Sequence, residues 1–174
     1  MLRRLAVRCV VLLPVLWLIA QPQAQGQSRQ ANLKVSATVV DSCVITADPL
    51  NFGPYDPVSA NASQPLDATS TVTVTCTKGA GGWLYLYDGA NYAQATATIN
   101  SRRAMAGSTG ALLAYDLFKD SGRVQRWGSF VAGLDIPAAP SSAPRTFTVY
   151  GRIRAGQDVP LGAYSDTVVL EVVF

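Results

Sequence analysis

The 174-residue chain contains no histidine, and this removes most of the usual catalytic chemistry. Without an imidazole there is no Ser-His or Cys-His pair, no histidine base and no histidine-bound metal. Glycoside hydrolysis needs two placed carboxylates, but Asp88, Asp120 and Asp158 neighbour turn glycines or strand ends, where local backbone hydrogen bonds favour Asp. The GAGG run at 79–82 lacks the lysine and strand–helix context of a phosphate-binding loop. We therefore expect a protein that is not an enzyme and binds no metal or cofactor.

Three further features have a functional and a structural interpretation. Arg102 and Arg103 could bind an anion, although two adjacent basic residues more often lie on a solvated edge. Trp83 and Trp127 could stack on a sugar, but aromatic side chains in a β-sandwich more often fill its core. Asn61-Ala62-Ser63 matches a glycosylation sequon, which matters only in a host that has the machinery.

The first 24 residues have the pattern of a secretory signal peptide. Three arginines precede an apolar run at 9–20, which is too short for a membrane-spanning helix, and small residues follow it. Cleavage after Ala24 or Gly26 would leave about 150 residues, which is enough for one domain with a core. We expect an exported protein that passes through the periplasm.

Removing this segment changes the charge of the chain. Of 14 Lys+Arg, three lie in the predicted signal peptide, so 14 − 3 = 11 remain against 11 Asp+Glu. The mature chain is thus neutral, and its composition gives no reason to expect a nucleic-acid partner. A neutral surface favours association.

Two of the three cysteines, Cys43 and Cys76, remain after cleavage. In an exported chain a pair of cysteines most often forms a disulfide. Zinc is a poor alternative because it needs four ligands, and a reactive thiol would need a base or a cation beside it. A Cys43–Cys76 disulfide is therefore predicted, and closing its loop would stabilise the fold by roughly 3–4 kcal/mol.

From residue 30 onward, the sequence is a series of short segments with period-2 alternation, separated by Gly, Pro, Asn and Asp. The predicted strands are 31–40, 43–46, 70–77, 83–89, 112–118, 145–154 and 163–174. Residues 48–57 form a proline-rich loop, and residues 90–111 are expected to be loop or weak edge strand. Seven or eight strands at roughly ten-residue spacing predict an all-β, immunoglobulin-like sandwich.

The two ends of the mature chain form the strongest functional pattern. An amphipathic strand lies almost at the mature N-terminus, and a strand with apolar alternation is the last segment of the sequence. A sandwich that is short by one strand leaves an apolar groove and an unpaired edge, which another strand can complete. The N-terminal strand could fill the groove of a neighbouring copy, or it could be the ordinary first strand of a complete sandwich.

The sequence resembles the spore coat protein U domain, the domain of archaic, Csu-type chaperone–usher pilus subunits. The matching segments are DSCVITADPLNFGPYDP (41–57), VTVTCTKG (72–79), RAM (103–105), LLAYDLFKD (112–120), WG (127–128) and YGRIRAGQDVPLGAYSDTVVLEVVF (150–174). This resemblance favours the first alternative, an incomplete immunoglobulin-like β-sandwich completed by a donor strand from another subunit.

The resemblance implies a domain organisation and a set of site residues. A signal peptide (1–24) would be followed by a donor strand (25–40) and a sandwich domain (41–174), with a Cys43–Cys76 disulfide. The inserted face of the donor strand would be Ala31, Leu33, Val35, Ala37 and Val39. The groove would be lined by the last strand at Val168, Leu170, Val172 and Phe174.

The resemblance also implies a function. The chain would be a structural subunit of a surface pilus that polymerises by donor-strand complementation and supports adhesion and biofilm formation. Its partners would be copies of itself or related pilins, a periplasmic chaperone and an outer-membrane usher. The alternative is a stand-alone secreted or spore-coat sandwich, and a carbohydrate-binding module is a third possibility.

Overall fold

The computed structural model describes residues 25–174, so the predicted signal peptide lies outside the described residues. The described chain has two parts, residues 25–37 and residues 38–174. In the first part no residue belongs to a helix or strand, and every residue is exposed. The expected strand at 31–40 is therefore not formed in the single chain, because these residues have no partner strand.

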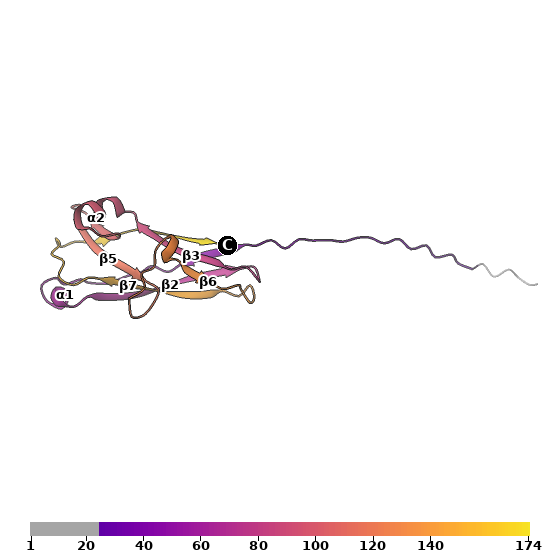
Figure 1. Cartoon of the computed structure of the whole chain (residues 1–174), viewed down its shortest axis with the longest axis horizontal. Helices are drawn as coiled ribbons and strands as arrows, with labels where there is room; N and C mark the ends of the chain where they lie inside the picture. Colours follow the sequence, from indigo (N-terminus) through magenta and orange to yellow (C-terminus); the bar gives the residue numbers. More distant parts are fainter. Residues whose placement is uncertain (1–24) are drawn as a thin grey trace, which may run out of the picture. The chain divides into compact units, whose positions relative to one another are not determined.

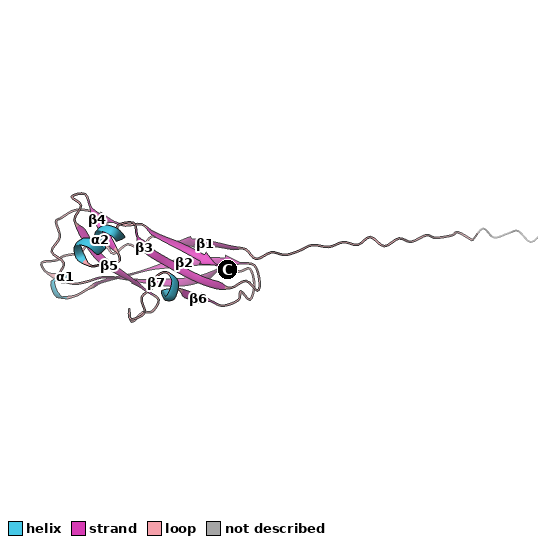
Figure 2. Ribbon diagram, turned by 45° about the horizontal axis from the view of Figure 1, so that its top comes forward, coloured by secondary structure: helices cyan, strands magenta, loops and turns pink. Residues whose placement is uncertain are grey.

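The larger part folds as two antiparallel sheets (Figures 1 and 2). The first sheet has the order β1-β2-β7-β5-β4-β8. Its strands are β1 (Cys43–Ala47), β2 (Leu66–Cys76), β7 (Arg145–Ile153), β5 (Leu112–Phe118), β4 (Ala104–Gly107) and β8 (Tyr164–Ser165). The second sheet has the order β6-β3-β9, with β6 (Leu134–Ile136), β3 (Gly82–Gly89) and β9 (Val168–Val173). This architecture confirms the predicted β-sandwich class.

The alternation along the strands directs one face of each sheet into a common core. Val72 and Val74 of β2 meet Leu84 and Leu86 of β3, and each of these side chains is at most 2% exposed. Trp127 lies among them, fully buried, and its indole N–H donates to the Leu84 carbonyl oxygen at 2.9 Å. The interpretation of Trp127 as a core residue is thus correct.

Short helices lie between the strands, and one of them corrects the sequence prediction. Residues 90–111 were expected to be loop or weak edge strand, but they contain α2 (Tyr92–Ile99) as well as β4. Only Ala95 of this helix is buried, so the segment has no apolar stripe that periodicity could detect. The other helices are α1 (Ala60–Ser63) and the 3₁₀ turn η1 (Phe130–Ala132).

Register shows which ends of the strands lie together. The start of β1 pairs with the end of β2, since Cys43 is opposite Cys76, and a short turn leads from β2 into β3. The start of β3 pairs with the end of β9, since Trp83 is opposite Val173. The first strand therefore begins at the same end of the sandwich at which the last strand ends. We call this end the disulfide end. Both α1 and α2 lie at the opposite end (Figure 1).

No helix among residues 25–174 is long and apolar enough to cross a membrane.

Candidate functional site

Strands β1 and β9 each have one unpaired edge among the described residues. β1 pairs with β2 alone, and β9 pairs with β3 alone. They belong to different sheets, and they lie close to each other without pairing. An unpaired edge presents a row of backbone N–H and C=O groups to which another strand can be added. The candidate site is this pair of edges and the space beside them.

A cavity of about 440 Å³ opens beside these two edges. Its walls are mostly apolar and come from both sheets and from the loop after β1; they include Val72, Leu86, Val149, Val168, Leu170 and Phe52. Several of these side chains belong to the hydrophobic core itself. An apolar strand in this cavity would therefore cover part of the core and remove its apolar area from water, which is favourable. We call this space the groove.

The alternation of β9 matches its place beside the groove. Val168, Leu170 and Val172 are half-buried and pack against the core, whereas Val169 and Val173 on the other face are 60% and 48% exposed. Of the four positions expected to line the groove, Val168 and Leu170 lie in its wall. Val172 packs on the core, and Phe174 follows the end of β9 and is 52% exposed.

The loop after β1 supplies a wall that the sequence did not predict. The Phe52 ring lies directly over Gly151 of β7, where an added Cβ atom would be 2.8 Å from the ring. The same ring packs edge-on against Tyr115, with 6.1 Å between the ring centroids. Because a larger residue at position 151 would displace this ring, Gly151 sets how far the loop closes over the groove.

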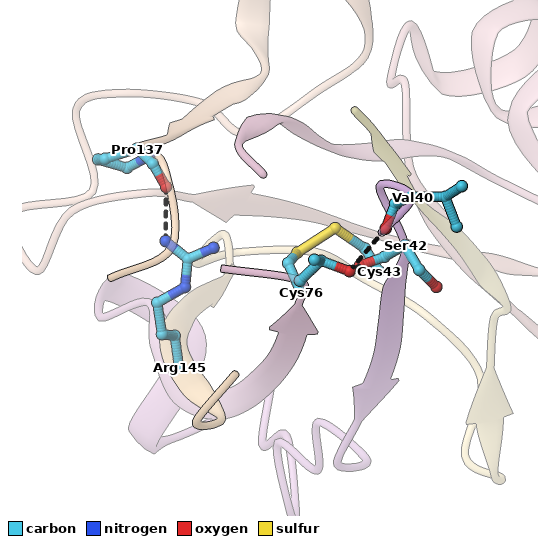
Figure 3. Close-up of a disulfide and its surroundings, with 7 residues drawn as sticks. Val40, Ser42, Cys43, Cys76, Pro137 and Arg145 are labelled. Atoms are coloured by element: carbon cyan, nitrogen blue, oxygen red, sulfur yellow. Dashed lines mark hydrogen bonds between the residues drawn. A yellow bond between two sulfur atoms is a disulfide. The ribbon is translucent and has the colours of Figure 1, made fainter. Parts of the chain in front are cut away.

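The disulfide end anchors the start of β1. Cys43 and Cys76 form the predicted disulfide (Figure 3). The Thr77 backbone N–H donates to the Ser42 carbonyl oxygen at 2.8 Å, and the Thr77 hydroxyl donates to the Val40 carbonyl oxygen at 3.1 Å. These bonds fix residues 40–42 against the end of β2.

The predicted donor positions are all exposed in the single chain. Leu33 and Val35 are 88% and 84% exposed in the N-terminal part, and Val39 is 84% exposed in the larger part. Ala31 and Ala37 are also exposed. Large aliphatic side chains that are this exposed leave apolar area in contact with water.

A polar network closes the groove near the start of β9. The Asp166 carboxylate accepts hydrogen bonds from the Tyr115 hydroxyl at 2.8 Å, from the Asn91 side-chain amide at 3.1 Å and from the Thr167 backbone N–H at 2.8 Å. Burial, and secondarily the negative charge of Asp166, raises the pKa of Tyr115 far above its ordinary value. Both side chains also line the groove.

The two adjacent arginines have different roles, and this corrects the prediction of a solvated edge. Arg103 is 5% exposed, and its guanidinium donates to the carbonyl oxygens of Leu86 at 2.6 Å and of Tyr87 at 2.8 Å. These carbonyls lie where the β3–β9 register shifts, before Gly89. Burial lowers the pKa of Arg103. Arg102 does lie at the surface, where it forms a two-bond ion pair with Asp88 at 2.7 and 3.1 Å.

The other candidate residues do not form a second site. Trp83 is 46% exposed, so its interpretation as a core residue is wrong, whereas Trp127 is buried and cannot stack on a sugar. Asn61 of the sequon is 5% exposed and its amide holds the backbone of its own loop, donating to the Gln64 carbonyl oxygen at 3.1 Å. Among residues 25–174 no three acidic or cysteine side chains are grouped so that they could hold a metal ion.

Comparison with known proteins gives consistent matches over most of the chain. The model of the Spore Coat Protein U domain family matches residues 29–171. Protein U of Myxococcus xanthus is 34% identical over 164 residues, which cover 90% of this chain and 91% of that protein.

A solved structure with a similar fold belongs to a pilus assembly system. It is a chain in the complex of CsuC and CsuE, a chaperone–tip adhesion subunit pre-assembly complex from the archaic chaperone–usher Csu pili of Acinetobacter baumannii. The TM-score is 0.55 at 26% identity, over 79% of this chain and 41% of that chain, so this chain spans less than half of its length. Together with the family match over residues 29–171, these similarities show that the protein belongs to the spore coat protein U domain family.

Proposed function

We propose that the protein is a structural subunit of a chaperone–usher surface fibre and polymerises by donor-strand complementation. The observation that supports this most directly is the open groove between β1 and β9, whose walls are core side chains. The same chain contains an exposed amphipathic segment that belongs to no strand. In this proposal the segment 31–39 of one copy lies in the groove of the next.

Insertion would pair the free strand edges and would also cover the exposed apolar face of the donor segment. The donor segment would add backbone hydrogen bonds to the free edges, and its alternating face would cover the cavity. Burying Ala31, Leu33, Val35, Ala37 and Val39 would contribute about 5–8 kcal/mol at ordinary transfer values. Since the two contacting surfaces differ, the contact is head-to-tail and generates a filament.

An open apolar groove also implies help before assembly. Unpaired strand edges beside apolar surface promote aggregation, so we propose that a periplasmic chaperone covers the groove after export and that an outer-membrane usher is the place of assembly. The pre-assembly complex of the similar Csu protein supports the chaperone. The finished fibre would lie on the cell surface and support adhesion and biofilm formation.

A second candidate function is a stand-alone secreted or spore-coat protein. It is favoured by the 34% identity to Protein U over nearly the whole of both chains, and by the coat role in the name of the family. This candidate predicts a stable monomer that needs no chaperone. It leaves the exposed segment 31–39 without a partner.

The test compares two single substitutions at neighbouring positions in the full chain, expressed in cells with its chaperone and usher. Leu33→Asp places a charge on the face that would enter the groove, while Asn32→Asp places the same charge on the opposite face. We expect Asn32→Asp to form high-molecular-weight multimers on gels run without boiling, and Leu33→Asp to stay at the size of the subunit. If both variants polymerise equally, donor-strand complementation by this segment is wrong.

A further inference from the structure

A second cavity lies next to the groove and is larger, at about 760 Å³. Two segments form most of it, one at 49–57 after β1 and the other at 159–164, which leads into β8. The second cavity continues the first, because five residues line both: Pro49, Leu50, Phe52, Met105 and Tyr164. Its lining includes Leu113 and Ile153 from the core and Val159 and Leu161 from the loop. We call it the loop cavity.

The loop cavity lies at the far end of the sandwich from the disulfide. Strand β1 runs from the disulfide end and is followed directly by the loop 49–57. Strand β9 runs toward the disulfide end, and the loop 159–164 and β8 precede it. The groove wall includes Ala47 at the end of β1 and Val168 and Leu170 at the start of β9, so the groove lies toward the same end and opens into the loop cavity.

Head-to-tail assembly fixes the end at which a donor segment enters. The N-terminal segment of each subunit starts from residues 40–42, which Thr77 holds at the disulfide end. A neighbour whose body lay at that same end would occupy the place from which the acceptor's own segment must leave. The neighbour's body lies instead at the end with the loop cavity, and its donor segment runs toward the acceptor's disulfide end.

The donor segment is longer than β9, so part of it extends beyond β9 at the end with the loop cavity. A donor of nine residues (31–39) spans roughly 30 Å as a strand, whereas the six residues of β9 span roughly 20 Å. About three donor residues thus extend past the start of β9. Because residue 40 is attached to the neighbour's body, this remainder includes residues 37–39 and crosses the loop cavity.

The residues that line the loop cavity favour contact with a side chain over pairing with a backbone strand. Pro49, Pro54, Pro57 and Pro160 line it, and proline has no N–H with which to extend a ladder. Val39 has the same facing as the groove-filling positions and is 84% exposed in the single chain. A branched aliphatic side chain fits an apolar recess with few donors.

We propose that the loop cavity receives Val39 of the next copy, so that the interface between subunits extends beyond the groove onto the loops at 49–57 and 159–164. This inference rests on the proposed function, because it assumes that the segment 31–39 of one copy inserts into another. It makes the two loops part of the subunit contact, and it makes Val39 a residue that determines the register of the donor.

The test uses pairs of cysteines in the full chain, assembled in cells. Val39→Cys is combined in turn with Val159→Cys, Leu161→Cys or Ala163→Cys, so that one of three positions around the cavity can meet the geometric limits of a disulfide. The matched control replaces Val39→Cys by Thr38→Cys, whose side chain has the opposite facing. We expect at least one Val39 pair to give a ladder of covalent oligomers on non-reducing gels, and the Thr38 pairs to give none.

The outcomes separate this inference from the proposed function. If the variants polymerise but no Val39 pair gives a stronger ladder than its Thr38 control, the loop cavity does not receive Val39, and the proposed function stands. If the unmodified chain forms no polymers with its chaperone and usher present, both the proposed function and this inference are wrong.

Discussion

The four outer edges of the two sheets differ in length and in how close they lie to another edge. β8 and β6, at one edge of each sheet, are short strands of two and three residues. β1 and β9, at the other edges, have five and six residues and lie close together. Short edges are a usual protection against unwanted pairing. One edge of each sheet is thus short, whereas the other two edges are longer, unpaired and near each other.

The region near β4 also contains several buried or half-buried side-chain hydrogen bonds. There the Arg103 guanidinium satisfies carbonyls at the register shift of β3, and Asp166 accepts three hydrogen bonds. On the open side, the start of β1 depends on one neighbouring strand and the disulfide. We therefore expect the two sides to respond differently to the loss of a contact.

The largest effect is expected from removing the disulfide on the open side. The double substitution Cys43→Ala and Cys76→Ala should lower the free energy of unfolding of the unassembled subunit by about 3–4 kcal/mol, because the unfolded chain gains entropy. Dissociation of the fibre releases a subunit that stays folded, so the dissociation temperature of the fibre should fall less than the melting temperature of the subunit. Thermal unfolding of the subunit and thermal dissociation of the fibre measure the two changes, and urea unfolding gives the loss of free energy.

The matched control for this prediction is Thr77→Ala. It removes the hydroxyl hydrogen bond to Val40 at the same end but keeps the disulfide, and it should cost about 1 kcal/mol. An equal fall of the two temperatures for the double cysteine variant would show that the disulfide acts on the contact between subunits as well as on the unfolded chain.

On the closed side, Arg103→Ala should lower the free energy of unfolding by about 2–3 kcal/mol. It leaves the carbonyl oxygens of Leu86 and Tyr87 buried without their charged donor. Arg102→Ala is the control at the next position, and loss of its exposed ion pair with Asp88 should cost at most about 1 kcal/mol. Similar urea midpoints for the two variants would show that Arg103 is not a structural residue.

Next in size is the response of the groove to loss of one side chain. Leu170→Ala should cost the unassembled subunit about 1–2 kcal/mol, because Leu170 is half-buried there. The fibre should lose more, since an inserted donor strand would bury the rest of the side chain. Val169→Ala, on the exposed face of the same strand, should change both by about 0.5 kcal/mol or less. Urea unfolding and fibre dissociation temperatures give the comparison, and a Leu170→Ala loss that is no larger in the fibre would contradict it.

The sequence predicted the alternating strands well, because each strand has one buried face. The inward-facing side chains of β9, which are Val168, Leu170 and Val172, follow from period-2 alternation alone. The helix α2 was missed because its small residues bury only Ala95. The different roles of Arg102 and Arg103 could not be predicted, because the carbonyls that Arg103 meets are freed by a register shift between β3 and β9. Such long-range pairing leaves no local signal.

The smallest effect is expected from one hydroxyl at the boundary between the two sides. Tyr115→Phe removes the bond to Asp166 and should cost about 1 kcal/mol at neutral pH. Because the pKa of Tyr115 is raised above its ordinary value of 10.0, the folded protein keeps this proton where the unfolded chain loses it. The stability that Tyr115 contributes is thus present in full below pH 10 and is lost as the pH rises further. Urea unfolding at pH 8 and near pH 11 should show a smaller alkaline loss in Tyr115→Phe than in the unmodified protein, and equal losses would show that burial of this hydroxyl does not couple folding to pH.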